Sequence, residues 1–352
     1  MEKNILISQE LLSKKELLTT KITLYHFEKL EEQKRNRLEY LKRKTKEDTD
    51  YNIIHLSEAI RYGSKHLFYN YVLWLKTLLK YYGVATEDLI EHFEISKQIM
   101  SQHFAKESYD EIALYLDKAI EALKDTMHTE GSFLKETNRH YEIARSYLDA
   151  ILETNRGKAI NIILTAVKTG IPVEEIYLDV FQPVQYEIGW LWQSNKISVG
   201  QEHYATAVTQ LAMSQLYPFI FTQEKKDYRF IACGVSEELH ELGIRMVADI
   251  FEMNGWDTYF MGANTPAVSI IKIIEEKNIQ VLALSATMLY HLRKVDEFID
   301  VIKSSTKIVP KIIVGGHAFK SDPDLWKKIG ADAYASDPKA AIIIAKNLIN
   351  QN

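Results

Sequence analysis

Residues 238–243 read Glu-Leu-His-Glu-Leu-Gly, a pattern that can do metal chemistry. His240 follows a short apolar stretch, 228–235, and precedes an amphipathic stretch, 242–254, so we expect it in a loop between a strand and a helix. In an open α/β sheet this carboxyl edge is where ligands bind. An imidazole there can ligate a metal, and Glu238 can hold it in one tautomer and raise its basicity. The spacing suggests a metal-bearing cofactor, and a solvated loop histidine is the alternative.

The elements that must position this histidine follow from the rest of the C-terminal third. Its sequence predicts strands at 228–235, 256–262, 280–287, 311–316 and 331–336, and helices at 242–254, 266–277, 292–304, 323–329 and 339–349. Such alternation favours parallel βαβ units with right-handed crossovers. Because 281–284 and 312–314 are continuously apolar, we expect these strands to be covered on both faces. Residues 228–352 therefore predict a Rossmann-like parallel sheet with helices on both faces.

Three of the predicted strands end in small or hydroxyl-bearing residues. They are Ser285 and Thr287, Gly315 and Gly316, and Ser336. Small side chains at these ends leave room for a flat or elongated group, and hydroxyls add hydrogen bonds without bulk. Glycines after strands also serve simple turns, but all three sites fall on the edge that presents His240.

Taken together, Glu238-x-His240-x-x-Gly243, Ser285-x-Thr287 and Gly315-Gly316 resemble the cobalamin-binding domain of corrinoid proteins. The resemblance covers residues 228–352 and implies cobalamin as the cofactor. It implies that His240 replaces dimethylbenzimidazole as the lower cobalt ligand, with Glu238, Leu239 and Gly243 around it. It further implies a slot for the displaced nucleotide tail, lined by Ser285, Thr287, Gly315, Gly316 and Ser336.

Helical periodicity extends upstream, from about residue 129 to 221. Apolar residues recur at helical spacing between Ile143 and Val167 and again between Ile176 and Ile188, and Gly170-Ile-Pro172 separates the two stretches. Four helical stretches in this span predict a four-helix bundle at 129–224. In proteins that resemble this one, such a bundle forms a cap over the corrin.

Nine residues separate Trp192 from the pair Glu202-His203 within this predicted bundle. The spacing resembles the W-x9-EH signature of adenosylcobalamin-dependent photoreceptors of the CarH type. It implies that Trp192 and Val199 pack against a 5′-deoxyadenosyl group, while Glu202 and His203 hydrogen-bond near it. A core tryptophan beside a surface Glu-His pair is the alternative.

This sequence departs from the photoreceptor pattern in two ways. Gln193 stands where many such photoreceptors carry a histidine that captures cobalt after photolysis, and an amide ligates cobalt poorly. Nor does the sequence before the bundle resemble the MerR-like DNA-binding domain of those regulators.

Residues 1–125 predict instead a helical domain of unknown role, for which dimerisation or signal output is the expectation. Helices are predicted at 55–82, 87–100 and 109–123, with Thr86 as an N-cap. The basic cluster at 34–46 is interleaved with acidic residues, which favours a solvated helix face over nucleic-acid binding. Protein partners are expected to contact this region. The layout weakly resembles helical regions that precede cobalamin-binding modules in other bacterial proteins.

Composition excludes several other classes of protein. At 352 residues, 46% hydrophobic and 26% charged with a net charge of −5, the chain is ordinary for a soluble protein of two or three domains. No apolar stretch approaches the ~20 residues that span a bilayer, and the N-terminus lacks the form of a signal peptide. The single cysteine, Cys233, excludes intramolecular disulfides, so we expect a cytoplasmic location.

Three functions remain open, and the sequence favours the first. A sensor would hold adenosylcobalamin between bundle and sheet, and light would break the cobalt–carbon bond and change the packing or the state of a homo-oligomer. The alternative is a corrinoid carrier that passes methyl groups to methyltransferases, and the third is a sensor of another tetrapyrrole, such as a bilin. Trp192 with Glu202-His203 favours a filled upper pocket and hence the sensor. No residue set resembles a catalytic pair, so no enzymatic activity is expected.

Overall fold

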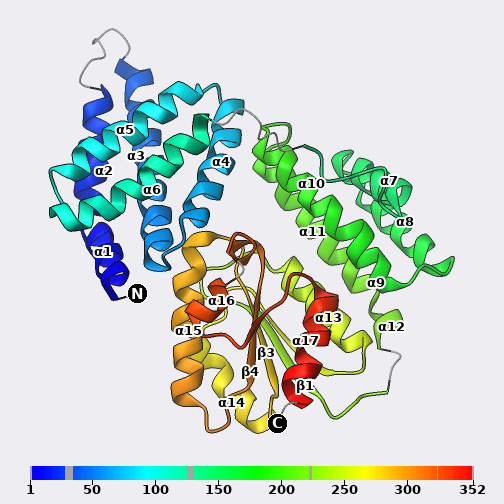
Figure 1. The fold of residues 1–352 in the computed structure, drawn as a ribbon. Coiled ribbons are helices and arrows are strands. Elements are labelled where there is room, and N and C mark those ends of the chain that lie inside the picture. The colour runs from blue at the N-terminus through cyan, green and yellow to red at the C-terminus, as the bar shows by residue number, and fades with distance from the viewer. Residues whose placement is uncertain (1, 28–34, 125–130, 222–223, 323, 351–352) are drawn as a thin grey trace. The chain divides into compact units, whose positions relative to one another are not determined.

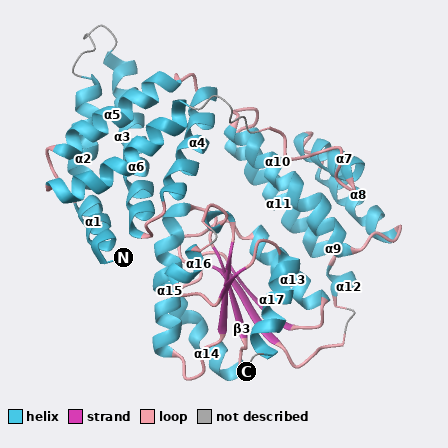
Figure 2. Ribbon diagram, viewed as in Figure 1, coloured by secondary structure: helices cyan, strands magenta, loops and turns pink. Residues whose placement is uncertain are grey.

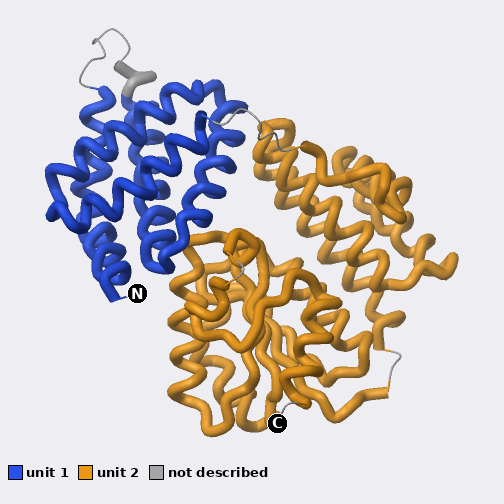
Figure 3. Tube along the Cα trace, viewed as in Figure 1, with its two compact units in different colours: residues 1–129 blue, residues 130–352 orange. Residues whose placement is uncertain are grey.

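A computed structural model describes residues 2–27, 35–124, 131–221, 224–322 and 324–350 of the chain. The chain divides into two compact units, 1–129 and 130–352 (Figure 3). The second unit contains both the predicted bundle and the predicted sheet. Within the described ranges, no helix is both long enough and apolar enough to cross a membrane.

The first unit is helical, as predicted. Its helices are α1 (Glu2–Ser13), α2 (Lys15–Phe27), α3 (Arg35–Arg61), α4 (Lys65–Tyr81), α5 (Thr86–Ser101) and α6 (Lys106–Lys124) (Figure 1). The α3 helix packs against α1, α2 and α4, while α6 packs against α4 and α5. The buried faces of these amphipathic helices form the core of the unit.

Two details of the helix prediction for this unit are wrong. The helix predicted over 55–82 is broken between α3 and α4, where Gly63 adopts a left-handed backbone with φ of 61°. The N-cap of α5 is Ala85 and not Thr86, and the carboxylate of Asp88 accepts a 3.2 Å hydrogen bond from the amide of Ala85. The acidic side chain at the third helical position thus satisfies the amide of the N-cap residue, which is one half of a capping box.

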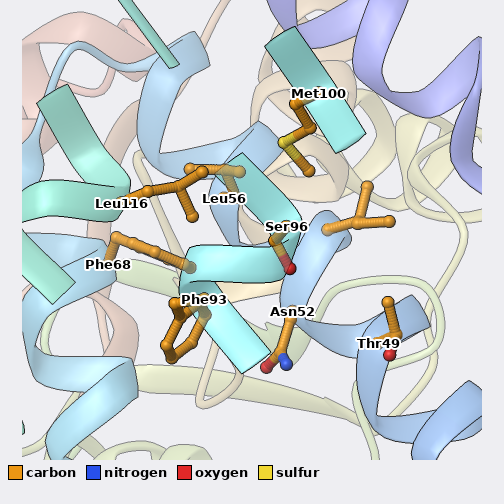
Figure 4. A pocket seen from close by; sticks show the side chains of 9 residues that line it. Thr49, Asn52, Leu56, Phe68, Phe93, Ser96, Met100 and Leu116 are labelled. Atoms are coloured by element: carbon orange, nitrogen blue, oxygen red, sulfur yellow. The ribbon is translucent and has the colours of Figure 1, made fainter. Parts of the chain in front are cut away.

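A chain of buried polar side chains crosses the core of the first unit. The Tyr71 hydroxyl donates to Oδ1 of Asn52 at 2.7 Å, and Nδ2 of Asn52 lies 3.1 Å from Nε2 of His92. On its other side, His92 lies 3.1 Å from Nε2 of His26. Asn52 also borders a cavity of about 10 Å³, room for about one water, among Thr49, Ile53, Leu56, Phe68, Phe93, Ser96, Met100 and Leu116 (Figure 4).

Oppositely charged side chains near the start of α3 form ion pairs with one another. Nζ of Lys44 lies 2.6 Å from the carboxylate of Glu47, and Nζ of Lys42 lies 3.6 Å from that of Glu39. Lys34, the first residue of the predicted basic cluster, lies outside the described residues. Such ion pairs between residues three positions apart are typical of a solvated helix face.

The helices of the bundle open the second unit. They are α7 (Tyr141–Leu152), α8 (Arg156–Lys168), α9 (Val173–Glu175), the π-helical η2 (Ile176–Phe181), α10 (Gln182–Gln193), α11 (Val199–Gln215) and α12 (Tyr217–Ile220). Since α9, η2 and α10 follow one another without a break, the bundle has four long helical stretches and a short last turn (Figure 1).

The π-helical segment has an identifiable cause. Pro183 has no amide hydrogen, so it cannot donate to the carbonyl of Asp179 one turn earlier. The side-chain amide of Asn138 donates to that carbonyl at 2.9 Å instead. The carbonyl group left free by the irregular turn therefore has a hydrogen-bond donor from outside the helix. A helix distortion of this kind needs such a donor.

A five-stranded parallel sheet follows the bundle, in the order β2-β1-β3-β4-β5, which confirms the predicted Rossmann-like fold. The strands are β1 (Arg229–Gly234), β2 (Asp257–Gly262), β3 (Val281–Ser285), β4 (Lys311–Gly315) and β5 (Ala333–Tyr334). The chain moves outward from β1 in opposite directions to β2 and β3, so the topological switch point lies between β1 and β3. Ligands bind beyond the carboxyl ends of strands at such a point.

Helices cover both faces of the sheet (Figure 2). On one face lie α13 (Leu242–Met253) and α17 (Pro338–Asn350), and on the other lie α14 (Ala267–Lys277) and α15 (Leu292–Ser305), with α16 (Leu325–Ile329) beside α15. Two short 3₁₀ turns, η3 (Leu289–His291) and η4 (His317–Phe319), follow β3 and β4. One hydrophobic cluster runs from the bundle through α13 into the sheet, so the two parts of this unit share a core.

Candidate functional site

His240 lies in the loop between β1 and α13, at the carboxyl edge of the sheet beside the switch point. Its side chain is 58% exposed, although its Nδ1 atom lies 2.6 Å from Oε1 of Glu238. A carboxylate can only accept here, so Nδ1 carries the proton and the lone pair of the neutral imidazole is on Nε2. This is the tautomer in which an exposed Nε2 can ligate a metal.

Glu238 is fully buried, with an exposed fraction of 0%. Its Oε1 also accepts from the amide of His240 at 2.9 Å, and its Oε2 accepts from the amide of Thr287 at 2.6 Å. Burial alone raises the pKa of Glu238, but the hydrogen bonds from His240, His291 and Thr287 outweigh it and hold the pKa far below its ordinary value. The carboxylate is therefore a fixed negative charge under the imidazole.

That charge acts in turn on His240. The hydrogen bond to Glu238 raises the pKa of His240, burial opposes the rise, and the charges of Glu238 and Glu202 add to it. Glu202 belongs to α11 in the bundle, and its charge is the smallest of these contributions. The structure brings His240 and Glu238, two of the residues predicted for the site, into direct contact.

The residues predicted to line the slot lie at the ends of β3 and β4. Ser285 is buried at the end of β3, and the amide of Thr287 is tied to Glu238. Gly316 has a φ of 99°, and a side chain there would place its Cβ 2.3 Å from the carbonyl oxygen of Ala286. At Gly315 a Cβ would lie 3.2 Å from the carbonyl oxygen of Ala335. At Gly316 only glycine permits this close approach, whereas at Gly315 a side chain would fit tightly.

Three further predicted residues lie around this edge without a direct contact to His240. Leu239 is 74% exposed, and a Cβ at Gly243, in the first turn of α13, would meet nothing within 4 Å. Ser336 is exposed after β5 and donates to Asp337 at 2.8 Å. An exposed leucine therefore precedes the imidazole in the chain, and a glycine without close neighbours follows it.

The predicted upper-face residues lie at the turn between α10 and α11. Trp192 is half-buried and packs against the hydrophobic core, and Val199 is 55% exposed at the start of α11. The side chain of His203 is 74% exposed, with Nε2 lying 3.5 Å from Glu202. Of this set, only Glu202 has an interaction with the His240 loop, through its charge. The roles of Trp192, Val199 and His203 stay predictions.

His140 and Glu175 form part of a second group of potential metal ligands in the bundle. Ligand atoms of His140, Glu175 and Asp179 all lie within 4.8 Å of one another. Nε2 of His140 is 2.7 Å from Glu175, whose other oxygen pairs with the guanidinium of Arg139 at 2.6 Å. The guanidinium already supplies the positive charge that a cation would bring to this group.

His291 is the site residue that sequence reasoning missed. It ends η3, is 3% exposed, and its Nδ1 lies 2.9 Å from Oε2 of Glu238. The sequence placed position 291 in an unassigned loop before a helix, and such a loop has no periodicity that predicts side-chain direction. The available signal was its location in the same strand-end loop as Thr287, one of the residues already assigned to the site.

These residues fit a corrinoid in two respects that the structure itself provides. The first is an exposed imidazole whose inner nitrogen is tied to a buried carboxylate, the support that metal-ligating histidines have. The second is the close backbone packing at the strand ends, where a Cβ at Gly316 would lie 2.3 Å from the carbonyl oxygen of Ala286. His240 would hold the cobalt, and the loops of Ser285, Thr287, Gly315 and Gly316 would hold the tail.

Comparisons with known proteins agree with this geometry. Two sequence families, each described as a B12 binding domain, match residues 228–343 and 143–217. "Dimethylamine corrinoid protein 3" of Methanosarcina acetivorans is 23% identical over 204 residues, 57% of this chain and 94% of the relative. "HTH-type transcriptional repressor CarH" of Myxococcus xanthus is 21% identical over 232 residues, 64% of this chain and 75% of the relative.

Among solved structures, the monomethylamine corrinoid protein of Methanosarcina barkeri is similar. It is 21% identical with a TM-score of 0.52, and the match covers 58% of this chain and 98% of the other. At this identity the likeness concerns the fold alone.

Proposed function

The chain is a cobalamin-binding domain protein, and on this premise we propose that it works as a corrinoid carrier, with His240 as the lower ligand of the cobalt. When bound, a corrinoid supplies a cobalt centre that can accept and donate a methyl group. The observation that carries the proposal is the pairing of exposed His240 with fully buried Glu238 at 2.6 Å. No step of the transfer itself is assigned to a side chain, so the protein is proposed as a carrier and not as the transferase.

The chain's own residues would bind the cofactor, orient its cobalt ligand and shield one of its faces. Glu238 fixes the tautomer of His240, so that Nε2 is the atom offered to the metal. Ser285, Thr287, Gly315 and Gly316 would hold the nucleotide tail, and the two glycines add no side chain to this edge. The bundle, which shares its core with the sheet domain, keeps one face of the cofactor away from bulk water.

The sequence favoured a light sensor, whereas the relatives favour the carrier. Dimethylamine corrinoid proteins from several Methanosarcina species are similar to this chain at 23–27% identity, compared with 21% for CarH. The stretch matched in the first of them covers 57% of this chain and 94% of that protein. The function of the first unit stays open.

Adenosylcobalamin sensing is retained as a second candidate because of one arrangement in the bundle. Trp192, Glu202 and His203 keep the spacing of the photoreceptor signature, and Glu202 acts electrostatically on His240. An aromatic wall beside a carboxylate suits a nucleoside better than a methyl group. As a sensor the chain would use the same lower ligand and would differ only in what occupies the upper face.

Absorption spectra of the full chain reconstituted with hydroxocobalamin test the cofactor. We expect a bound corrinoid with a protein-derived lower ligand, and His240→Ala is expected to give a base-off spectrum or to lose binding. His66→Ala, at an exposed position in the first unit, is the matched control and is expected to behave as wild type. Wild-type spectra in the His240→Ala protein would reject the assignment.

Binding of two cobalamins in the dark separates the candidates. A carrier is expected to bind methylcobalamin at least as tightly as adenosylcobalamin, with no change in size-exclusion elution after green light. A sensor is expected to prefer adenosylcobalamin, to lose this preference in Trp192→Ala, and to change its elution on illumination. The second set of results would replace the carrier with the sensor.

A further inference from the structure

We propose that one exposed face of α3 binds a second copy of this chain, with the two α3 helices antiparallel. The face consists of Tyr40, Lys44, Glu47 and Tyr51, and we call these four residues the α3 stripe. The stripe belongs to the first unit, so this inference does not depend on the corrinoid proposed for the second. It gives the dimerisation expected of residues 1–125 a defined surface.

The four residues of the α3 stripe lie on one side of the helix. They are separated by steps of four, three and four residues, which is the spacing of the contact positions in a two-stranded coiled coil. The other side of α3 faces the core of the first unit, where Thr49 and Asn52 are 0% and 5% exposed. The stripe therefore points away from that core.

Every side chain of the α3 stripe is about half exposed. The exposed fraction is 54% for Tyr40 and 53% for Tyr51, and it is 47% for each of the side chains of Lys44 and Glu47. The guanidinium of Arg43 lies 5.5 Å from the centroid of the Tyr40 ring, a cation–π contact that restricts the ring. Tyrosine and arginine are enriched at interfaces between proteins, so this surface has the composition of a contact site.

The order of residues along the α3 stripe is symmetric. Positions 40 and 51 lie equally far from the midpoint between residues 45 and 46, and so do positions 44 and 47. When two α3 helices lie antiparallel across a two-fold axis at this midpoint, Tyr40 faces the partner's Tyr51 and Lys44 faces the partner's Glu47. The axis repeats each contact, so the stripe is complementary to itself, as a two-fold interface requires.

The charges of the α3 stripe favour a second copy over other occupants. In the antiparallel pair both contacts of Lys44 with Glu47 are attractive, whereas a parallel pair would place like charges against one another. A nucleic acid would meet as many carboxylates as ammonium groups on this stripe, which gives no net attraction. Within one chain, Nζ of Lys44 already lies 2.6 Å from Glu47, so the four charges of a dimer would form one ring of alternating sign.

Charge reversal followed by mixing of the variants tests the contact. Sedimentation equilibrium of the full-length protein should show a dimer. Lys44→Glu or Glu47→Lys alone should raise its dissociation constant at least about tenfold, because each homodimer then contains two like-charge contacts. An equimolar mixture of the two variants should recover the wild-type affinity, since every contact in the heterodimer joins opposite charges. Each variant keeps a like-charge pair within its own helix, so the recovery can come only from contacts between chains.

A second ion pair with the same spacing provides the matched control. Lys118 and Glu121 on α6 pair at 2.8 Å and are also exposed, so Lys118→Glu and Glu121→Lys should leave dimerisation unchanged. Tyr40→Ser should also weaken the dimer, whereas Tyr82→Ser, at a tyrosine that is 59% exposed after α4, should not. Circular dichroism of each variant shows whether its helices are retained.

Four results would overturn the inference. The first is a wild-type protein that is monomeric throughout the measured concentration range. The second is a dimer that neither charge reversal affects, because its interface would then lie outside the α3 stripe. The third is a pair of folded variants that dissociate but do not recover on mixing, which would assign the effect to charges within one helix. The fourth is a mixture that associates more tightly than the wild type, which would indicate parallel helices.

Discussion

The hydroxyl of Tyr177 donates a 2.8 Å hydrogen bond to the carboxylate of Asp249, and this contact joins the π-helical turn of the bundle to α13 of the sheet domain. Asp249 is 6% exposed, so its charge sits inside the shared core of the second unit. The contact couples the packing of the two parts to the protonation of one carboxyl group.

Stability should therefore depend on pH through Asp249. Burial raises the pKa of this carboxyl from 3.8 to about 6, while Tyr177 and Arg245 oppose the rise. Between these pH values the folded protein binds more protons than the unfolded chain, so this contribution to stability is lost as pH rises towards 6. Asp249→Asn should flatten that slope and increase stability at pH 7 by up to about 3 kcal/mol, which urea unfolding from pH 4 to 7 measures.

Asp257→Asn is a control for which we expect the opposite dependence of stability on pH. Its carboxylate pairs with Lys225 at 2.8 Å, and the hydrogen bond from Lys225 lowers the pKa of Asp257. A lowered pKa gives stability that is lost as pH falls, so this variant should be most affected near neutral pH. An Asp249→Asn protein that keeps the wild-type slope would remove the link between this residue and pH.

Acid should weaken the first unit through its buried histidines. Burial lowers the pKa of His55 from 6.5 to about 4 and that of His92 to about 3. Below pH 6.5 these histidines are protonated in the unfolded chain but stay neutral in the folded unit. The free energy of unfolding therefore falls as pH decreases towards 4. At pH 5 the loss from His55 alone is at most about 2 kcal/mol.

Hydrogen exchange measured by mass spectrometry can locate this loss. Protection factors corrected for intrinsic rates should fall in α3 and α5 between pH 7 and 5. In His55→Phe, which preserves the ring that stacks on Tyr71 at 3.7 Å, the fall should be smaller. Equal falls in wild type and variant would show that another group is responsible.

Replacing Gly316 with alanine should be costly, since a positive φ and a carbonyl 2.3 Å from the new Cβ both oppose a side chain. We expect a loss of more than about 2 kcal/mol in the free energy of unfolding. Gly243→Ala is the matched control, because its Cβ meets nothing within 4 Å and it lies in a helix, where alanine is favoured by up to about 1 kcal/mol. Thermal melting of both proteins without cofactor measures the difference, and similar losses would contradict the close approach.

Glu187 anchors the segment that leads into the bundle. This buried carboxylate accepts from the hydroxyl of Ser132 at 2.8 Å and from the amides of Phe133 and Leu134 at 2.7 and 3.3 Å. Glu187→Met removes the acceptor of the Phe133 amide and should cost about 2 kcal/mol, whereas Glu187→Gln keeps an acceptor and should cost less. Limited proteolysis near residue 133 and urea unfolding test this order, and a reversed order would exclude the anchoring role.

The sheet domain was predictable because its signals are local and repeated. Apolar strands such as 281–285 and amphipathic helices such as α13 can each be recognised from a few neighbouring residues. The observed ends of these elements differ from the predicted ends by a few residues at most. The contact between His240 and Glu238 was predictable for the same reason, since they are near neighbours in one loop. Chain order alone then placed the loops after β1, β3 and β4 on one edge.

Contacts across the fold were not predictable in this way. The hydrogen bond from His291 to Glu238 joins residues 53 positions apart, and nothing in the sequence around position 291 indicates which way that ring points. The break at Gly63 was missed because a glycine inside an apolar stretch is compatible with either a helix interior or a helix end. Side-chain direction in loops and the choice between two allowed backbone states both depend on packing from distant segments.

The hydrophobic cluster shared by bundle and sheet has a consequence for how a large ring enters the second unit. Pulling the two parts away from one another would wet apolar side chains on both, and each buried Leu, Ile or Phe side chain opposes this by roughly 1.5–3 kcal/mol. The bundle and the sheet are therefore expected to stay associated when a cofactor enters the second unit.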